Sequence, residues 1–85
     1  MNLDYYKTFY YVALSKNFTK AAELLGNNQP NVTRSMNNLE AELGCRLFAR
    51  SNRGVSLTPI GEQLFQYVSA AMNNLEREKR RLRRR

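Results

Sequence analysis

Residues 28–38 concentrate short and planar hydrogen-bonding side chains to a degree that is unusual for the surface of a helix. At about 100° per residue, a helix over this stretch places on one face Pro30, Thr33, Arg34 and Asn37, with Gln29 and Asn38 at its margins. A solvated face normally carries Glu and Lys four residues apart, but the only charged residue in this stretch is Arg34. Such side chains suit base edges and phosphate oxygens, so we interpret the face as a reader of nucleic acid.

The chain offers little for catalysis or metal binding. It has no histidine to act as a general base, and its seven acidic residues form no obvious converging pair. Cys45 is the only cysteine, which excludes an internal disulfide and leaves no zinc site, and we interpret it as a small buried hydrophobe. We therefore expect a binding protein that is not an enzyme and that needs no metal or other cofactor.

The net charge of +7 is unevenly distributed. Residues 76–85, EREKRRLRRR, hold seven basic and two acidic side chains, a net +5, which leaves +2 for the rest of the chain. The more informative basic cluster is Arg46, Arg50 and Arg53, which has no acidic residue within it. Clustered basic side chains indicate a polyanionic partner.

The length of 85 residues predicts one small domain with a limited core, so we expect a partner chain to add buried surface. The sequence contains no apolar run of about 18 residues and no basic-then-apolar leader with a cleavage site. These features predict no membrane contact and a cytoplasmic location.

Two short helices joined by a tight polar turn are predicted between residues 18 and 43. The first ends at Gly26, after an apolar stripe formed by Ala21, Ala22, Leu24 and Leu25. Asn28 caps the second helix, and Pro30 falls in its first turn, where a missing amide proton costs little. The core side of this second helix consists of Val32, Met36, Leu39 and Leu43. The pair has the outline of a helix-turn-helix.

An earlier helix is predicted to begin after Asn2, with Asp4 in its first turn. The side that we expect to face the core consists of Leu3, Tyr6, Phe9, Tyr10 and Ala13. Tyr5, Tyr11 and Val12 lie off that side, so the helix has more apolar surface than one domain needs. Part of this surface is expected to meet a second subunit.

A hairpin is predicted after the helix-turn-helix, because the turn-forming cluster Ser51-Asn52-Arg53-Gly54 separates two short apolar segments. A hairpin in this place is a wing. Its tip presents Arg53, which can enter a minor groove or lie along phosphates. Arg50 has two interpretations, either a contact with DNA or an internal salt bridge.

A long helix is predicted from Pro59 onward, with Thr58 before it and Glu62 in its first turn. About 27 residues of helix span roughly 40 Å, so the distal half should project from the domain. Its apolar residues recur at steps of four and three, as in a coiled coil. They could pair with a second copy of the chain, or they could pack on their own domain. The residues expected in a homodimer interface are Leu64, Val68, Ala71 and Leu75. We divide the chain into a DNA-binding domain over 1–58 and a linker and dimerisation helix over 59–85.

From Leu3 to about Leu75 the sequence resembles the N-terminal DNA-binding domain of the LysR-type bacterial transcriptional regulators. The resemblance is carried by residues that include Phe18-Thr19, Ala21-Ala22, Gln29-Pro30, Leu39-Glu40, Leu43-Gly44, Leu47-Phe48, Arg50, Arg53, Leu57-Thr58 and Gly61. It implies a mainly α-helical fold, a winged helix-turn-helix of three helices and a two-stranded wing, followed by a linker helix that dimerises. The effector-binding domain that the family carries beyond this helix has no counterpart in these 85 residues, and a full-length parent could form higher oligomers.

The resemblance also implies roles for individual residues. Gln29, Pro30, Thr33 and Arg34 would lie in the major groove of promoter DNA, Arg53 would be the wing contact, and Thr19 would bind a phosphate. The sequence departs from the family pattern at Asn31 and Thr33, on the DNA face, and at Ile60 in the linker helix. The implied function is sequence-specific binding of double-stranded DNA by a dimer, at a pseudo-palindromic promoter site in the bacterial nucleoid.

Two other classes of function stay open at this stage. The basic end of the chain could bind nucleic acid without reading its sequence, which differs from specific binding in its salt and sequence dependence. Alternatively, the long helix could be a coiled-coil interaction module capped by the remaining residues. Mutation of the face that contains Gln29 would leave that last function unchanged.

Overall fold

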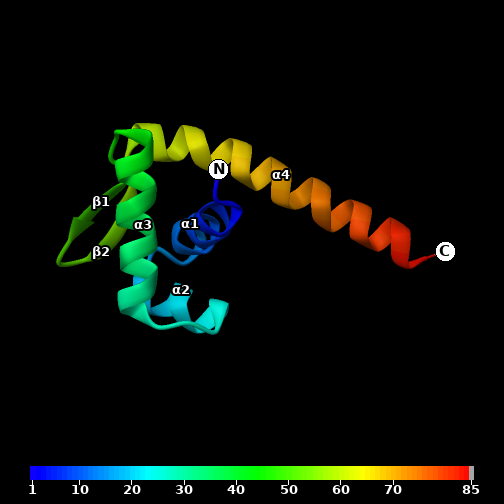
Figure 1. Cartoon of the computed structure of the whole chain (residues 1–85), viewed down its shortest axis with the longest axis horizontal. Helices are drawn as coiled ribbons and strands as arrows, with labels where there is room; N and C mark the ends of the chain where they lie inside the picture. The colour runs from blue at the N-terminus through cyan, green and yellow to red at the C-terminus, as the bar shows by residue number, and fades with distance from the viewer. Residues whose placement is uncertain (85) are drawn as a thin grey trace.

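The computed structural model describes residues 1–84, so Arg85, the last residue of the predicted linker segment, lies outside the described residues. Its elements, in chain order, are α1 (Leu3–Ser15), α2 (Phe18–Leu25), α3 (Gln29–Leu43), β1 (Phe48–Ser51), β2 (Gly54–Leu57) and α4 (Pro59–Arg83). Helices α1 to α3 pack together, the hairpin lies beside α3, and α4 extends away from them (Figure 1). This is a winged helix-turn-helix followed by a long helix, as the sequence predicts.

The ends of the first three helices are set by local side-chain and glycine chemistry. The Oδ1 atoms of Asn2, Asn17 and Asn28 accept hydrogen bonds from backbone N–H groups in the first turns of α1, α2 and α3. Gly26 and Gly44 end α2 and α3 with φ angles of 65° and 70°, which glycine adopts without steric cost. The predicted caps Asn2, Asn28 and Gly26 are therefore confirmed.

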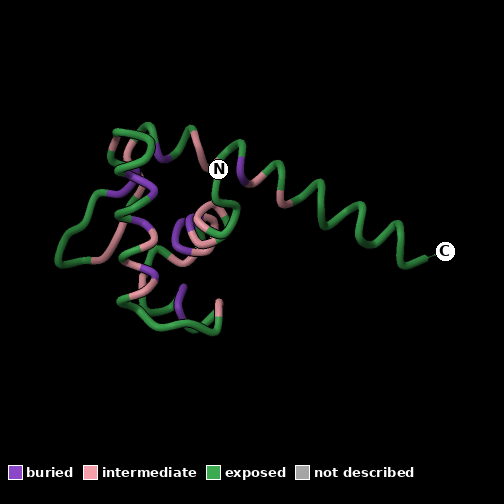
Figure 2. The backbone as a smooth tube through the Cα atoms, viewed as in Figure 1, coloured by how far each residue is buried: buried purple, intermediate pink, exposed green. Residues whose placement is uncertain are grey.

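The core lies where α1, α2, α3 and the start of the wing meet (Figure 2). Its largest fully buried side chains are Phe9, Val12, Val32, Met36, Leu39, Leu47 and Phe48. The ring of Phe48 has its centroid 5.4 Å from that of Phe9 and 5.8 Å from that of Phe18. These aromatic contacts fix the first strand of the wing against α1 and α2.

The buried face of α1 agrees with the predicted one at Phe9 and Ala13 but differs from it at two other positions. Val12, which was predicted to lie off the core side, is fully buried, whereas Leu3 is 72% exposed. Because apolar residues surround most of this helix, periodicity alone does not select one face, and packing against α2 and α3 decides. Leu24 and Leu43, which were predicted in the apolar stripes of α2 and α3, are also exposed.

The root of α4 is joined to the wing by a small set of backbone contacts. The Thr58 N–H donates to the Leu47 carbonyl (3.0 Å), and the Thr58 hydroxyl donates to the Arg46 carbonyl (2.7 Å). The same hydroxyl oxygen accepts from the Gly61 N–H (3.0 Å), which makes Thr58 the N-cap of α4. Gly61 is buried against the Leu47 backbone, so the first turn of α4 sits directly on the start of the wing.

The rest of α4 makes few contacts with the domain. The Phe65 ring stacks on the Tyr10 ring with centroids 5.9 Å apart, and Val68 joins the core. Beyond Met72 the helix is exposed, and it accounts for the 47 Å long axis of the molecule. Within residues 1–84, no helix combines the length and the hydropathy needed to cross a bilayer.

Candidate nucleic-acid interface

The outer face of α3 presents the polar side chains that the sequence singles out. Gln29, Pro30, Arg34 and Asn37 are exposed, and Thr33 is half-buried. The opposite side of the helix is held in the core by the buried apolar residues Val32, Met36 and Leu39. The helix is therefore fixed in position with its polar face toward solvent.

Hydrogen bonds along α3 link several of these side chains to one another. Gln29 Nε2 donates to Thr33 Oγ1 (2.7 Å), and Arg34 Nη1 donates to Asn31 Oδ1 (2.9 Å). Asn31 Nδ2 in turn donates to Asn27 Oδ1 (3.0 Å). Thr33 and Asn31, the two departures from the family pattern on this face, are thus partners of the candidate readers Gln29 and Arg34. Such bonds restrict the rotamers of exposed side chains before any ligand is bound.

Asn38 is placed differently from the other candidates. Its Nδ2 donates to the hydroxyl of Tyr5 on α1 (3.2 Å). This bond draws the side chain toward α1, in keeping with the marginal position that helical geometry predicts for it.

The wing lies beside α3, and its tip is formed by Asn52 and Arg53 between the paired residues Ser51 and Gly54. Arg53 is exposed, and its backbone N–H donates to Ser51 Oγ (3.2 Å). Gly54 has a φ angle of 120°, which favours glycine at this turn. The hairpin therefore carries the exposed Arg53 at its tip.

Thr19 is exposed in the first turn of α2, behind the N-cap Asn17. A shallow hollow separates this turn from the wing, and it is lined by Asn17, Phe18, Thr19, Arg50, Ser51, Gly54 and Val55. The structure thus brings Thr19 and Arg50, which are far apart in the sequence, to one surface.

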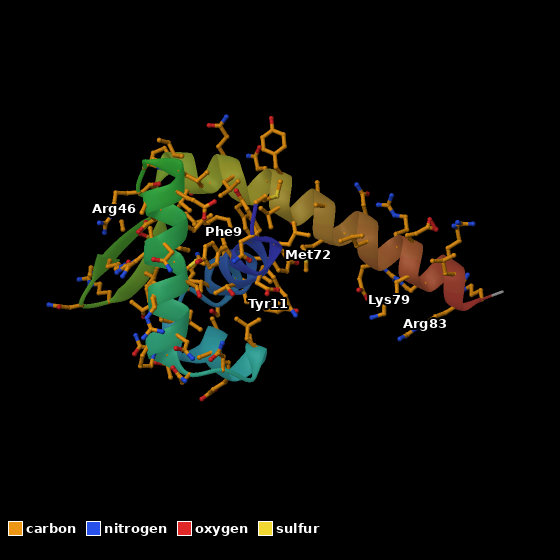
Figure 3. All side chains as sticks on the ribbon, viewed as in Figure 1. Phe9, Tyr11, Arg46, Met72, Lys79 and Arg83 are labelled. Atoms are coloured by element: carbon orange, nitrogen blue, oxygen red, sulfur yellow. The ribbon has the colours of Figure 1, made fainter. Side chains whose placement is uncertain are left out.

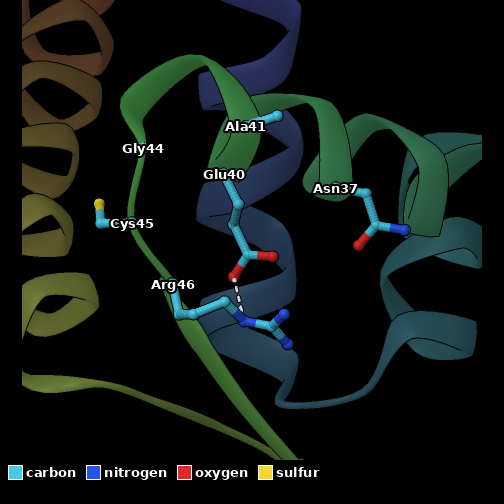
Figure 4. A pocket seen from close by; sticks show the side chains of 6 residues that line it. All are labelled: Asn37, Glu40, Ala41, Gly44, Cys45 and Arg46. Atoms are coloured by element: carbon cyan, nitrogen blue, oxygen red, sulfur yellow. Dashed lines mark ion pairs between the residues drawn. The ribbon is translucent and has the colours of Figure 1, made fainter.

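Glu40 is a buried carboxylate at the junction of α3 and the wing (Figure 4). Its Oε2 accepts hydrogen bonds from the backbone N–H groups of Leu47 (2.7 Å) and Phe48 (3.1 Å). Arg46 Nε lies 3.8 Å from Oε2, and Arg50 Nη2 lies 3.6 Å from Oε1. These bonds and charges offset the cost of burying the carboxylate.

The role of Glu40 was not predicted from the sequence, where it stands only within the family motif Leu39-Glu40. The available signal was its spacing, because Glu40 lies four residues after Met36 and therefore on the apolar side of α3. A charged residue on that side requires a partner in the core.

Arg50 makes the internal contacts that were one of its two predicted interpretations. Its Nη2 donates to Asn37 Oδ1 (2.8 Å) and faces Glu40, while its guanidinium carbon lies 5.0 Å from the centre of the Phe18 ring. The side chain is 32% exposed. Arg50 therefore joins the wing to both α2 and α3 through a hydrogen bond, an ion pair and a cation–π contact.

The residues predicted for a homodimer interface divide into two groups. Val68 is buried in the core of its own domain and Leu64 packs against that core, whereas Ala71 and Leu75 are exposed. An apolar groove between the start of α1 and α4 is lined by Met1, Leu3, Asp4, Tyr6, Lys7, Leu64, Tyr67, Val68, Ala71, Met72 and Leu75. Leu3, which the sequence placed in the core, lies in this groove.

The basic end of α4 is remote from the α3 face. Lys79 and Arg83 extend from the far half of the helix, away from α1 to α3 (Figure 3). Part of the charge is paired within the helix, between Glu76 and Lys79 and between Glu78 and Arg81. The geometry separates this segment from the candidate readers.

An exposed polar helix in a helix-turn-helix, flanked by a hairpin with arginine at its tip, defines the winged helix-turn-helix class of proteins. Residues 3–62 match the family described as bacterial regulatory helix-turn-helix protein, lysR family. The chain belongs to this family of bacterial regulators.

The comparisons also identify individual relatives. The HTH-type transcriptional regulator YofA of Bacillus subtilis (strain 168) is 46% identical over 70 residues, and BenM of Acinetobacter baylyi is 38% identical over 76 residues. These matches cover 82% and 89% of this chain, and in each case the chain spans 25% of the length of the regulator.

Solved structures agree with this assignment. A complex of the BenM DNA-binding domain with catB site 1 DNA superposes with a TM-score of 0.87 at 36% identity, covering 99% of this chain and 94% of that one. CbnR, a LysR family transcriptional regulator, superposes with a TM-score of 0.83 at 36% identity, covering 98% of this chain and 29% of that one.

Proposed function

We propose that this chain is the DNA-binding domain of a LysR-type transcriptional regulator and binds a promoter site in double-stranded DNA, in the bacterial cytoplasm. The observation that carries the proposal is the polar face of α3, which is held outward by a buried opposite side and flanked by the wing. The similar domain of BenM has been solved in complex with DNA.

In this proposal α3 is the recognition helix and enters the major groove. Gln29 and Arg34 read base edges, with Thr33 and Asn31 as their side-chain partners. Thr19 binds a phosphate at the start of α2, where the helix dipole favours an anion. Arg53 on the wing reaches the minor groove or the backbone beside it.

The active form is proposed to be a homodimer. The groove between α1 and α4 is apolar, and Leu75 at its edge is 68% exposed. A second copy of the chain would remove this surface from water, a favourable change of about 25 cal/mol per Å² of apolar area. A symmetric dimer presents two recognition helices, which predicts a pseudo-palindromic site with two half-sites.

Selection of binding sites from random duplex DNA tests the proposed function. The expected result is enrichment of an imperfect palindrome whose half-sites lie about one or two helical turns apart. Binding that depends on salt but enriches no sequence would contradict the proposal, because it would indicate phosphate contacts alone.

The dimer is tested by Leu75→Asp, which changes an exposed side chain and should leave the fold of the domain intact. We expect a monomer in sedimentation velocity and sharply weaker binding to the palindrome. Asn73→Asp adds the same charge at an exposed position of α4 outside the groove and serves as the matched control. A Leu75→Asp protein with the mass of the unmodified chain would refute this interface.

A further inference from the structure

We propose that Arg50 and Glu40 fix the side-chain amide of Asn37 so that its Nδ2 donor faces the DNA and reads a hydrogen-bond acceptor on a base edge. The inference rests on the proposed function, since it requires α3 to lie in the major groove. The inference gives Asn37, which lies on the predicted reading face, the role of a hydrogen-bond donor to a base. It assigns Arg50 and Glu40 as the residues that position Asn37.

Asn37 lies on the candidate reading face, one helical turn after Thr33, and is exposed. Its Oδ1 accepts a hydrogen bond from Arg50 Nη2 at 2.8 Å. An asparagine amide has an acceptor end and a donor end that point in different directions, as Figure 4 shows for this residue. Because Arg50 holds the acceptor end toward the wing, the donor end is the one that points away from Arg50 and can meet a ligand.

The position of Arg50 is itself fixed. Its guanidinium group is held by Asn37, by Glu40 Oε1 at 3.6 Å and by the ring of Phe18 at 5.0 Å. Glu40 cannot move with it, because Oε2 accepts the two backbone N–H groups of Leu47 and Phe48. The orientation of Asn37 thus depends on a chain of contacts that starts at a buried carboxylate.

Flipping the Asn37 amide would place its NH₂ group against the guanidinium group of Arg50, so that two donors would face each other. An amide without such a neighbour flips easily, since its oxygen and nitrogen ends have nearly the same shape. Without Arg50 the Asn37 amide could present either its oxygen or its NH₂ group to a base. The contacts of Arg50 therefore orient it so that it presents the NH₂ donor.

A donor at this place predicts a preference among bases. In the major groove guanine offers N7 and O6 and thymine offers O4 as acceptors, whereas cytosine offers the N4 amino donor. At the base pair that Asn37 meets, cytosine facing the amide should therefore be disfavoured against guanine or thymine. One neutral hydrogen bond corresponds to about a two- to tenfold difference in affinity.

Asn37→Asp tests the polarity directly. Aspartate keeps an oxygen for Arg50 and replaces the outward donor by an acceptor, so site selection should now enrich cytosine or adenine at that one position. The added negative charge weakens binding to all sequences alike and leaves their ranking unchanged. We expect a reversal of about two- to tenfold in relative preference at that position, with the other positions as in the unmodified chain.

Glu40→Gln tests the positioning. The glutamine oxygen must take the place that accepts the Leu47 and Phe48 N–H groups, which leaves its NH₂ group facing Arg50. Arg50 then loses its anionic partner, and the preference at the Asn37 position should flatten while preferences elsewhere persist. Glu42→Gln removes the same charge from an exposed position of α3 and is the matched control.

Thermal unfolding shows whether each variant is folded. If Glu40→Gln does not fold, the base preferences selected by Asn37→Asp test the inference by themselves. An Asn37→Asp profile identical to that of the unmodified chain at every position would overturn the inference. A folded Glu40→Gln protein with an unchanged preference would overturn the positioning role. If the unmodified chain enriches no site, the proposed function itself fails, which is a separate and recognisable result.

Discussion

Gly61→Ala should destabilise the domain, although alanine is the better helix former and position 61 lies within α4. A Cβ atom at Gly61 would fall far inside van der Waals contact with the carbonyl oxygen of Leu47, 3.0 Å from the Leu47 carbonyl carbon and 3.2 Å from Leu57 Cδ2. The first two atoms are backbone and cannot rotate away. Leu47 is also held by its hydrogen bonds to Glu40 and Thr58, so α4 must move instead.

The expected magnitude is the difference between two opposing effects. Helix propensity alone favours alanine over glycine by about 1 kcal/mol. Overpacking in a closed site costs about 1–3 kcal/mol, and the rigid neighbour places this case at the upper end. We therefore expect a net loss of about 2 kcal/mol in the free energy of unfolding, which lowers the Tm of a domain of this size by roughly 8–16 °C.

Urea and thermal unfolding followed by circular dichroism measure this effect. The protein concentration is held fixed, because the proposed dimerisation would make Tm concentration-dependent. Gln66→Ala, at an exposed position of the same helix, is the control and should change stability by less than about 0.5 kcal/mol. A Gly61→Ala protein as stable as the unmodified chain, or more stable, would show that propensity outweighs the contact with Leu47 and would refute the reasoning.

Three further predictions concern the root of α4 and the DNA face. Thr58→Ala removes the cap of α4 and the bond to the Arg46 carbonyl and should cost about 1–2 kcal/mol in urea unfolding, whereas Thr58→Ser should retain most of the stability; equal losses would argue against a role for the hydroxyl. Gln29→Ala should weaken binding to the best site by about 1–3 kcal/mol and relax the base preference at one position. An equal loss on all sequences in a mobility-shift titration would indicate that Gln29 contacts the DNA backbone and not a base. Arg53→Ala should weaken binding most at sites with A·T-rich flanks, where the minor groove is narrow, and a loss independent of the flanks would leave only a phosphate contact.

The features that could be predicted from the sequence are those with local causes. Asn28 and Gly26 define the turn between α2 and α3 because a side-chain cap and a left-handed backbone each depend on one residue and its immediate neighbours. The wing follows from a turn-forming cluster between apolar segments, and its tip, with Arg53, lies where the cluster predicts. The polar face of α3 follows from helical periodicity once the buried side is known.

The features that could not be predicted depend on contacts between distant segments. Glu40 binds backbone groups seven and eight residues away, and Arg50 is thirteen residues from Asn37. Leu47, Phe48 and Arg50 all lie beyond the end of α3, so helical periodicity indicates that Glu40 needs a partner but not which groups supply it. The buried face of α1 was predicted only in part for a related reason. Phe9 and Ala13 are buried as expected, but Val12 and Leu3 can be told apart only by what packs against them.

The direction of the long α4 helix is set at its root, where Gly61 lies against Leu47 and where Phe65 and Val68 pack on the domain. Its 25 residues correspond to a helix length of about 37 Å. A tilt of about 10° at this root would displace the far end of α4 by about 6 Å. A small change in packing around Leu47 would therefore move the far end of the helix much more than its root. Because the Leu47 N–H donates to Glu40, the residue whose carbonyl lies against Gly61 also belongs to the contacts that orient the recognition face.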